Sequence, residues 1–552
     1  MKNRLTEGAE QAGRRAGGPA SGRRRWMGLG VLVAGLSMIV LDGTIVGVAL
    51  PTIITELSLD LSEAQWVNGI YSVVFAALLL TAGRVGDRLG RRSLFVVGLI
   101  VFMVGSGLAA LSSDAGLLIA ARLVQGLGGA LILPSTLSTM NATFRGRDRA
   151  VAFGIWGAVI SGVAALGPLL GGWLTTAFSW QWIFIVNIPV GIVILIAAFL
   201  FVDQTKAHIT APGIDVDGLL LSAIGFGGVV FALIEGASLG WWMPEADFQI
   251  FGWVWPETAP ISIVPVVGTI GIAALVLFVL WERHRGRNGR SAILDLRLFR
   301  HASFTWGNVT ALCVAIGEFG LLFVLPLYIV NAMGLTTLGA GLVLAAMGAG
   351  AFLSGALARR LSERFGATRV VTMGLVIEVV GVLAATWLVS PSVAPWLLAI
   401  VLAVYGLGLG LASAQLTGTV LADVPPEQSG QGSATQSTVR QVGSALGTAV
   451  IGAVLAAGLA VSLPQQLDGV DGVDAAAATQ LETQTEQSAG SNLPGLRAQG
   501  TPDDVVDALT AGMTAASRAA LLSAAGFLVL GLGSSLVLDR QAGRRPQRTP
   551  VE

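Results

Sequence analysis

Long apolar runs alternate with short polar segments along almost the whole chain. Each run has about 20 residues or more, the length that crosses a hydrocarbon layer of about 30 Å as a helix. This pattern predicts an all-α polytopic membrane protein rather than a series of soluble domains. By run length we expect fourteen spans, near residues 27–50, 63–82, 93–112, 115–137, 150–176, 181–202, 214–238, 261–282, 303–330, 338–358, 369–390, 394–421, 435–460 and 517–538.

Composition agrees with the apolar runs, since 54% of the 552 residues are hydrophobic and only 12% are charged. The 73 glycines suit closely packed membrane helices. The single cysteine, Cys313, excludes an intrachain disulfide and a cysteine cluster for a metal ion. Phosphate-loop, Ser/His/Asp and metal-ligand signatures are missing from the sequence. We therefore expect no enzymatic activity, no metal or other cofactor and no nucleic-acid partner.

The charges in the loops alternate along the chain. Arginines gather in every second loop, for example in 83–92 and 283–300 and in the tail after 539, whereas the loops between them hold Glu56, Asp60 and other acids. The positive-inside rule then places both termini in the cytoplasm and the protein in the cytoplasmic membrane. The segment 422–436 is an exception, because it is expected inside and has no Lys or Arg.

The spans group into two halves with additional elements. We expect a cytoplasmic basic tail at 1–26, a six-helix bundle at 27–202, a linker at 203–302 with two additional spans, a second six-helix bundle at 303–538 and a cytoplasmic tail at 539–552. Within the second bundle, the segment 461–516 is rich in Ala, Gln, Thr, Asp and Gly. That composition predicts a mobile acidic external loop with a short helix near 503–514.

One charged loop occurs twice. The segment Gly83–Arg92 reads GRVGDRLGRR, and the spacing of Arg84, Asp87, Arg88 and Gly90 returns in Arg360, Glu363, Arg364 and Gly366. A loop duplicated in two halves of a membrane protein indicates a transporter built from repeats. Asp87, together with Gly83, Gly90, Arg88, Arg91 and Arg92, is expected to form a latch, since a carboxylate near a helix end pairs with arginine or accepts backbone hydrogen bonds. The alternative is that these charges only fix the topology.

Six ionisable residues lie inside the apolar runs, where a charge costs about 2.5–3.5 kcal/mol at mid-helix. A carboxyl group that binds and releases a proton needs desolvation and a competitor for its charge, such as a cationic substrate or an arginine. Asp42, Arg122 and Glu318 are our proton-coupling candidates. The alternative for the first two is a permanent ion pair between helices, and the alternative for Glu318 is a polar contact between helices. The other three are Glu235, expected near the outer interface, Glu378 and Arg440.

A proline stands among glycines in the fifth run. Gly167 and Pro168 are followed one turn later by Gly171 and Gly172. Proline removes a helical hydrogen bond and kinks the helix, while glycines allow close helix contact. The motif predicts either a packing seam or a hinge between two halves of a transporter, and these two interpretations are compatible.

These motifs together resemble the major facilitator superfamily and, within it, the fourteen-span drug:proton antiporters of the EmrB/QacA type. GRVGDRLGRR is similar to the superfamily loop signature, and LDGTIVGVALPTI (Leu41–Ile53) to the first-span motif of these exporters. ARLVQGLGGALILP (Ala121–Pro134) resembles the fourth-span motif, and GPLLGG (Gly167–Gly172) the fifth-span antiporter motif. Further segments typical of this branch are SWQWIFIVNIPVG (Ser179–Gly191), LPLYIV (Leu325–Val330) and TVRQVGSALG (Thr438–Gly447).

The resemblance implies two six-helix bundles around a central cavity and proton-driven efflux of amphipathic, cationic or neutral small molecules by alternating access. In that scheme Asp42 and Glu318 carry protons, Arg122 tunes their release, and Asp87, Arg88 and Arg91 stabilise the outward-open state. The proton gradient is the energy source, and the protein works as a monomer in the lipid bilayer. Candidate residues of the substrate cavity are Trp66, Asn68, Tyr71, Gln125, Glu378 and Arg440.

Two departures from the family pattern bear on this scheme. Asn68 stands where several relatives that carry organic cations have an acid, and Glu363 replaces the aspartate in the second loop copy. A dedicated exporter of an endogenous metabolite such as an antibiotic, or a lipid translocator with the same fold, therefore stays open. The antiporter motif argues against a nutrient importer, the charges in the spans against a receptor, and the missing nucleotide motif against an ATP-driven pump without a separate subunit.

Overall fold

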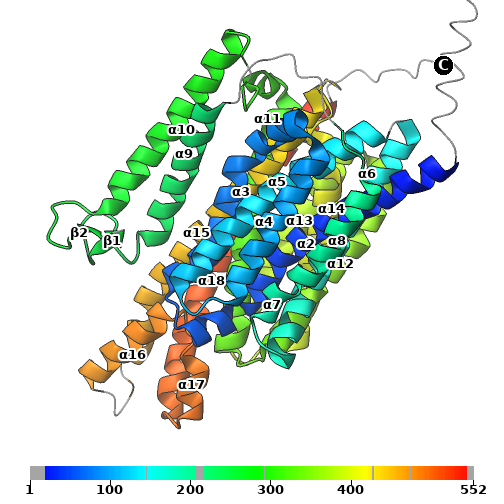
Figure 1. Ribbon diagram of the computed structural model, residues 1–552. Helices are drawn as coiled ribbons and strands as arrows, with labels where there is room; N and C mark the ends of the chain where they lie inside the picture. The colour runs from blue at the N-terminus through cyan, green and yellow to red at the C-terminus, as the bar shows by residue number, and fades with distance from the viewer. Residues whose placement is uncertain are drawn as a thin grey trace, which may run out of the picture.

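The computed structural model describes residues 19–144, 146–205, 215–250, 252–290, 292–425, 428–468, 470 and 474–543. This part of the chain is almost entirely helical (Figure 1), and its one sheet is the short antiparallel pair β1 (Phe248–Ile250) and β2 (Trp253–Trp255). The all-α prediction is thereby confirmed. Helix is the expected solution, because a helix satisfies its own backbone hydrogen bonds in a solvent that offers none.

The N-terminal bundle packs α4 against α5, α3 against α5 and α2 against α6. Acidic side chains define where two of its helices begin. Asp60 Oδ1 accepts the Glu63 amide at 2.7 Å while Glu63 Oε2 accepts the Asp60 amide at 3.0 Å, and Asp114 Oδ1 accepts the Leu117 amide at 2.9 Å. The helices are α2 (Pro19–Leu57), α3 (Leu61–Leu89), α4 (Arg91–Ala110), α5 (Ala115–Thr143), α6 (Gly146–Ala177), α7 (Trp182–Ile185) and α8 (Asn187–Phe201).

Two helices between the bundles, α9 (Val216–Glu235) and α10 (Ile263–Arg287), pack side by side as a hairpin that carries β1 and β2 at its tip (Figure 1). α9 contacts α3 of the first bundle and α15 (Ser429–Leu467) of the second. Val230 and Ile234 form one apolar cluster with Val73 from α3 and with Ala445 and Ala449 from α15. The hairpin therefore lies across the boundary between the two bundles.

The C-terminal bundle repeats the pattern of close helix pairs, with α12 against α14, α13 against α14, and α11 against both α15 and α18. α11 ends in a π-helical turn, η2, just before α12. Besides α15, its elements are the 3₁₀ turn η1 (Leu296–Arg300), α11 (Ala302–Leu327), η2 (Tyr328–Ala332), α12 (Thr337–Phe365), α13 (Ala367–Leu388), α14 (Pro395–Val420) and α18 (Asp503–Gly543).

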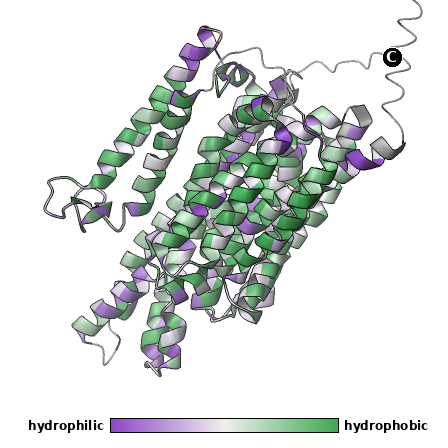
Figure 2. Cartoon of the chain, in the orientation of Figure 1, coloured by the Kyte–Doolittle hydropathy of each residue, from purple (hydrophilic) through white to green (hydrophobic). Residues whose placement is uncertain are grey.

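Twelve helices of the described chain are long and apolar enough to cross a membrane. The two expected spans outside this number, 63–82 and 150–176, coincide with α3 and α6. The fourteen-span count stays a prediction. Apolar residues dominate the middle of the bundles and of the hairpin, and polar ones gather at helix ends (Figure 2). Large apolar side chains such as Val193 and Leu530 are 66% and 62% exposed, as expected for a multi-pass protein surrounded by lipid.

The segment 461–516 differs from the expectation of a mobile loop. α15 continues to Leu467, α16 (Ala475–Gln487) and α17 (Leu493–Ala498) follow, and α18 begins at Asp503. Arg497 fastens this segment to the bundle, since its guanidinium donates to the carbonyls of Asn331 and Ala332 at 3.3 and 3.2 Å and to Thr510 Oγ1 at 2.9 Å. The expectation of a loop was wrong where α16 and α17 form, because alanine, glutamine and glutamate are also good helix formers, while the short helix expected near 503–514 is present as the start of α18.

The predicted tails are only partly described. α2 starts at Pro19, so the end of the expected basic tail is helical, while residues 1–18 and 544–552 lie outside the described part. Arg24 pairs with Asp203 at 3.3 Å and Arg25 with Asp148 at 3.8 Å. The first turns of α2 thus share one end of the bundle with the end of α8 and the start of α6.

Candidate functional site

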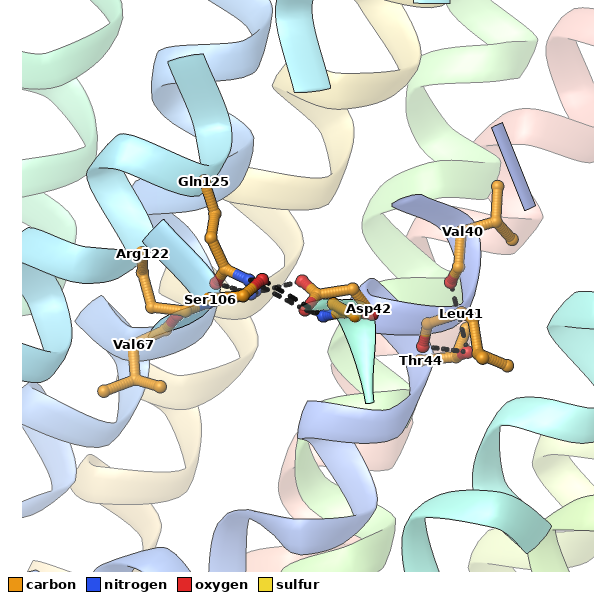
Figure 3. Close-up of polar contacts among 9 residues, drawn as sticks. Val40, Leu41, Asp42, Thr44, Val67, Ser106, Arg122 and Gln125 are labelled. Atoms are coloured by element: carbon orange, nitrogen blue, oxygen red, sulfur yellow. Dashed lines mark hydrogen bonds and ion pairs between the residues drawn. The ribbon is translucent and has the colours of Figure 1, made fainter. Parts of the chain in front are cut away.

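A buried ion pair lies inside the N-terminal bundle (Figure 3). Arg122 Nη1 on α5 donates to Asp42 Oδ2 on α2 at 2.5 Å, and both residues are 1% exposed. Sequence analysis predicted such a pair as the alternative to a coupling role. The geometry itself is compatible with both, because a coupling carboxylate must hold its counter-charge in one state of the cycle.

Asp42 accepts two further hydrogen bonds at its second oxygen. Gln125 Nε2 on α5 and Asn187 Nδ2 at the start of α8 each donate to Asp42 Oδ1 at 3.0 Å. The same two amides donate to Ser106 Oγ on α4, at 2.8 and 3.2 Å. The carboxylate therefore has three donors, which is the arrangement that stabilises a buried negative charge.

Arg122 is held from the other side by α3. Its Nε donates to the carbonyl oxygen of Val67 at 3.1 Å, and Nη1 also donates to Gln125 Oε1 at 2.9 Å. The guanidinium carbon lies 4.7 Å from the centre of the Tyr71 ring, within the range of a cation–π contact. Five helices thus meet at one charged pair, and losing either partner would leave a buried charge at a cost of about 3–5 kcal/mol.

Four residues singled out from the sequence, Asp42, Tyr71, Arg122 and Gln125, come together in this cluster. Tyr71 and Gln125 are 5% and 0% exposed, so in this conformation they serve the cluster rather than line an open cavity. Sequence reasoning missed Ser106 and Asn187. Asn187 stood inside the quoted segment Ser179–Gly191, where an amide in an apolar run was the signal that could have identified it.

A second ion pair lies in the C-terminal bundle. Arg440 Nη2 on α15 is 3.2 Å from Glu318 Oε2 on α11. Glu318 is 8% exposed, whereas the side chain of Arg440 is 49% exposed. Glu318 and Asp42 therefore lie in different bundles, and each pairs with a different arginine. This pair is open on one side, unlike the enclosed pair of the other bundle.

Glu378, Trp66 and Asn68 have three different environments. Glu378 on α13 is fully buried, and neither of its oxygens has a hydrogen-bond partner within the described chain. Trp66 Nε1 donates to Glu235 Oε1 at 2.6 Å, which joins α3 to α9, and Ser238 Oγ donates to Glu235 Oε2 at 2.8 Å. Asn68 is half-buried on α3. Glu235 is therefore a helix-joining group rather than a merely interfacial one.

The glycine–proline motif of α6 lies where the two bundles touch. A Cβ atom at Gly167 would overlap Thr44 of α2, and one at Gly171 would lie 2.9 Å from the carbonyl oxygen of Ile45. On the other side, a Cβ at Gly172 would lie 2.7 Å from the carbonyl oxygen of Thr337 on α12, and one at Gly341 of α12 would lie 2.5 Å from that of Pro168. The motif forms a packing seam; its role as a hinge stays a prediction.

The repeated loops have the same backbone turn. Gly90 between α3 and α4 has φ +114°, and Gly366 between α12 and α13 has φ +89°, values that favour glycine. Arg91 Nη1 donates to the carbonyl of Ser138 at 2.9 Å, Arg92 Nη1 to that of Val202 at 3.4 Å, and Gly83 faces Pro134. The side chains of Arg84 and Asp87 lie outside the described residues, so the predicted latch stays a prediction, and so does the part assigned in it to Arg88.

No group of three His, Cys, Asp or Glu side chains in the described chain has the arrangement of a metal site. Of the ionisable groups discussed above, Asp42 and Glu318 are paired with arginine, Glu235 accepts hydrogen bonds from Trp66 and Ser238, and Glu378 is buried without a hydrogen-bond partner in the described chain. A buried carboxyl group of this kind can exchange a charge partner or a proton.

Comparison with known proteins agrees with this architecture. The sequence profile of the Major Facilitator Superfamily matches residues 32–448. A probable actinorhodin transporter of Streptomyces coelicolor is 33% identical over 448 residues, covering 79% of this chain and 73% of that protein. A methylenomycin A resistance protein of Bacillus subtilis is 32% identical over 426 residues, covering 77% of this chain and 86% of its own.

A solved structure shows the same fold. It is a bacterial homologue of the human lysosomal transporter Spinster in an inward-facing and unoccupied conformation, with a TM-score of 0.62 and 16% sequence identity. The match covers 95% of this chain and 99% of the other. At this identity the likeness concerns the fold alone.

Proposed function

This chain belongs to the Major Facilitator Superfamily, and from that premise we propose that it is a proton-coupled exporter of amphipathic, cationic or neutral small molecules. It works as a secondary antiporter of the fourteen-span drug:proton type in the cytoplasmic membrane, with both termini inside and a single chain as the working unit. The relatives named for a transported or resisted antibiotic support export.

The observation that carries this proposal is the enclosed pair of Asp42 and Arg122. A proton that binds Asp42 removes the charge that holds Arg122, and the five helices joined at this point then lose a shared contact. Proton binding is thereby linked to the packing of the whole N-terminal bundle. A structural pair alone would not need its charges, since apolar residues of similar volume are often as stable.

The contacts between the bundles support an inward-open state. Thr52 Oγ1 lies 2.8 Å from Thr337 Oγ1, and the Leu338 amide donates to Thr176 Oγ1 at 3.2 Å. These residues are at the ends of α2 and α6 and the start of α12, which positive-inside topology places outside. Since these contacts close the external side, the substrate enters from the cytoplasmic side. The bundles then move relative to each other at the glycine–proline motif of α6.

A dedicated exporter of one endogenous metabolite is the second candidate. Asn68 provides no charge for a cationic substrate, and one relative is named as a probable actinorhodin transporter. A lipid translocator is less favoured, because α9 covers the boundary between α3 and α15 where cargo would enter sideways from the bilayer.

The test is uphill efflux of a lipophilic cationic dye from purified protein in proteoliposomes with an imposed proton gradient. We expect dye efflux that an uncoupler abolishes and that Asp42→Asn reduces by about 100-fold or more, as expected when a positioned proton-transfer group is lost. The matched control is Asp217→Asn, which makes the same change at an exposed acid in the first turn of α9. Uncoupler-sensitive efflux at the wild-type rate in Asp42→Asn would contradict the role of this carboxylate. If no dye moves, a screen of endogenous metabolites in the same vesicles decides between the two candidates.

A further inference from the structure

Each bundle contains a pair of helices whose backbones meet at glycines, α4 with α5 in the first bundle and α13 with α14 in the second. We call these two contacts seams, as distinct from the glycine–proline motif of α6. In the N-terminal bundle, a Cβ at Gly98 on α4 would lie 2.8 Å from the carbonyl oxygen of Gly128 on α5, and one at Gly128 would lie 2.7 Å from that of Gly98. In the C-terminal bundle, a Cβ at Gly374 on α13 would lie 2.7 Å from the carbonyl oxygen of Gly408 on α14, and one at Gly408 would lie 2.5 Å from that of Gly374. The backbones therefore touch at equivalent points.

The two seams also match seven residues further along α4 and α13, which is about two helical turns. A Cβ at Gly105 would lie 2.7 Å from the backbone nitrogen of Gln125, and a Cβ at Gly381 would lie 2.7 Å from the Cα of Tyr405. The spacing from the first to the second glycine is the same in α4 and α13, and the loops before these helices are the repeated ones. The equivalent of Gln125 is therefore Tyr405.

In α4 and in α13, one residue between the two glycines lies against a glycine of the partner helix. In α4 it is Phe102, whose amide would lie 2.5 Å from a Cβ at Gly128. In α13 it is Glu378, whose amide would lie 2.6 Å from a Cβ at Gly408. The side chain of Phe102 and that of Glu378 are both 0% exposed. One bundle thus places a carboxyl group where the other places a core phenylalanine.

The carboxyl group of Glu378 is costly at this position. Neither of its oxygens, nor the hydroxyl of Tyr405 beside it, has a hydrogen-bond partner in the described chain. An ionised carboxylate buried without a partner costs several kcal/mol, so the group is neutral in this conformation. Phenylalanine in the equivalent seam shows that close packing of such a helix pair does not require an acid.

Within the described chain, Glu378 interacts electrostatically with three ionisable side chains. They are Glu318 on α11, Arg440 on α15 and Tyr405 on α14, and α12 and α18, which also pack against α13, contribute none. Arg440 is the only cation of the three, and it is now paired with Glu318. An ionised Glu378 would therefore compete with Glu318 for one guanidinium.

We propose that Glu378 is a proton-binding site of the C-terminal bundle, which carries a proton in this conformation and releases it when Arg440 turns from Glu318 toward it. The release breaks the carboxyl O–H bond and gives one proton to water, while the arginine stays charged. This inference rests on the proposed proton-coupled export. It adds a second, separate proton site to the one formed by Asp42.

The direct test is infrared difference spectroscopy of the purified full-length protein in nanodiscs, between alkaline and acidic buffer and between dye-free and dye-bound states. We expect the stretching band of a buried protonated carboxyl group in wild type and its loss in Glu378→Gln, with Glu363→Gln as the exposed control. The same band in Glu378→Gln, or its absence in wild type, would overturn the proposal. This measurement needs no transport, so it stands even if dye export fails.

The second readout is transport. In proteoliposomes we expect Glu378→Gln to keep dye exchange at equal concentrations but to lower steady-state uphill accumulation by about 50-fold, the ratio that one proton moved through 100 mV supports. Glu378→Leu keeps the seam apolar, as Phe102 does, and should give the same result with a protein of at least wild-type thermal stability. Unchanged uphill accumulation in both variants would overturn a role in coupling.

Discussion

Asp42 in the N-terminal bundle accepts hydrogen bonds from three side chains, whereas Glu378 in the C-terminal bundle accepts none from the residues that the structure describes. Both carboxyl groups are buried. In the first case the surrounding helices supply a guanidinium and two amides, which stabilise the charged form. In the second case α13 and α14 touch at glycines on both sides of the carboxyl group, and no side chain of the described residues donates to it.

This difference teaches how one fold can hold two acids in different protonation states. The first bundle supplies donors that favour a charged carboxylate, whereas the second supplies none within the described residues and so favours a neutral carboxyl group. In the proposed cycle, Asp42 can therefore bind a proton while the contacts of Glu378 stay unchanged, and Glu378 can release a proton while the contacts of Asp42 stay unchanged. The repeated architecture provides the frame, and the residues at equivalent positions decide the electrostatics.

The largest expected effect comes from breaking the N-terminal pair. Arg122→Ala leaves Asp42 buried without its counter-charge, so we expect a loss of about 3–5 kcal/mol of unfolding free energy. Thermal unfolding of purified protein in detergent measures it. The double variant with Asp42→Asn should recover most of the stability but no proton-driven transport. If the single and double variants unfold at the same temperature, the pair does not hold the five helices together.

A medium effect tests the equivalence of the seams. Gly128→Ala and Gly408→Ala each introduce a Cβ within 2.5 Å of backbone atoms of the partner helix, and we expect losses of about 1–3 kcal/mol in both bundles. Gly418→Ala on the same α14 meets no atom within 4 Å and should be neutral or stabilising. A neutral Gly408→Ala beside a damaging Gly128→Ala would show that the two seams are not alike.

The smallest effect concerns a half-buried acid outside the spans. Burial raises the pKa of Glu486 on α16, with Glu245 and Glu482 adding to the shift. Because the pKa of Glu486 is higher in the folded than in the unfolded protein, ionising this group costs more in the folded state. The folded protein therefore keeps its full stability at low pH and loses some of it as pH rises through the folded-state pKa. Glu486→Gln should therefore remove this small loss of stability toward neutral pH. Hydrogen exchange of α16 at two pH values measures this, and identical pH dependence in both proteins would contradict it.

Much of the Asp42 site was visible in the sequence, because a charge inside an apolar run is exceptional. Asp42 and Arg122 were found in this way, and an ion pair between them was the expected alternative to a coupling role, whereas Gln125 was singled out only as a candidate of the substrate cavity. Ser106 and Asn187 were not identified from the sequence, since a hydroxyl in a membrane helix gives no comparable signal and the amide of Asn187 gives a weaker one than a charge does. Only the packing of α4 and α8 against α2 and α5 brings them to the carboxylate.

The segment 461–516 shows where composition misled. Its polar residues suggested disorder, yet they form α16 and α17, and Arg497 binds carbonyl groups 166 and 165 positions earlier in the chain. A contact between residues so far apart in the sequence cannot be predicted from the local pattern of residues. The bounds of the two bundles and the hinge role of Gly167 to Gly172 remain predictions on which the structure is silent.

The sequence by itself determined the helices, the repeated loops and the identity of the buried charges. Lipid leaves a chain no alternative to satisfying its own backbone, so apolar run length is nearly sufficient for each span. Tertiary structure decided which acid has donors and which has none. That depends on the distance between helices, and glycines far apart in the chain, such as Gly374 and Gly408, set this distance only when their helices meet.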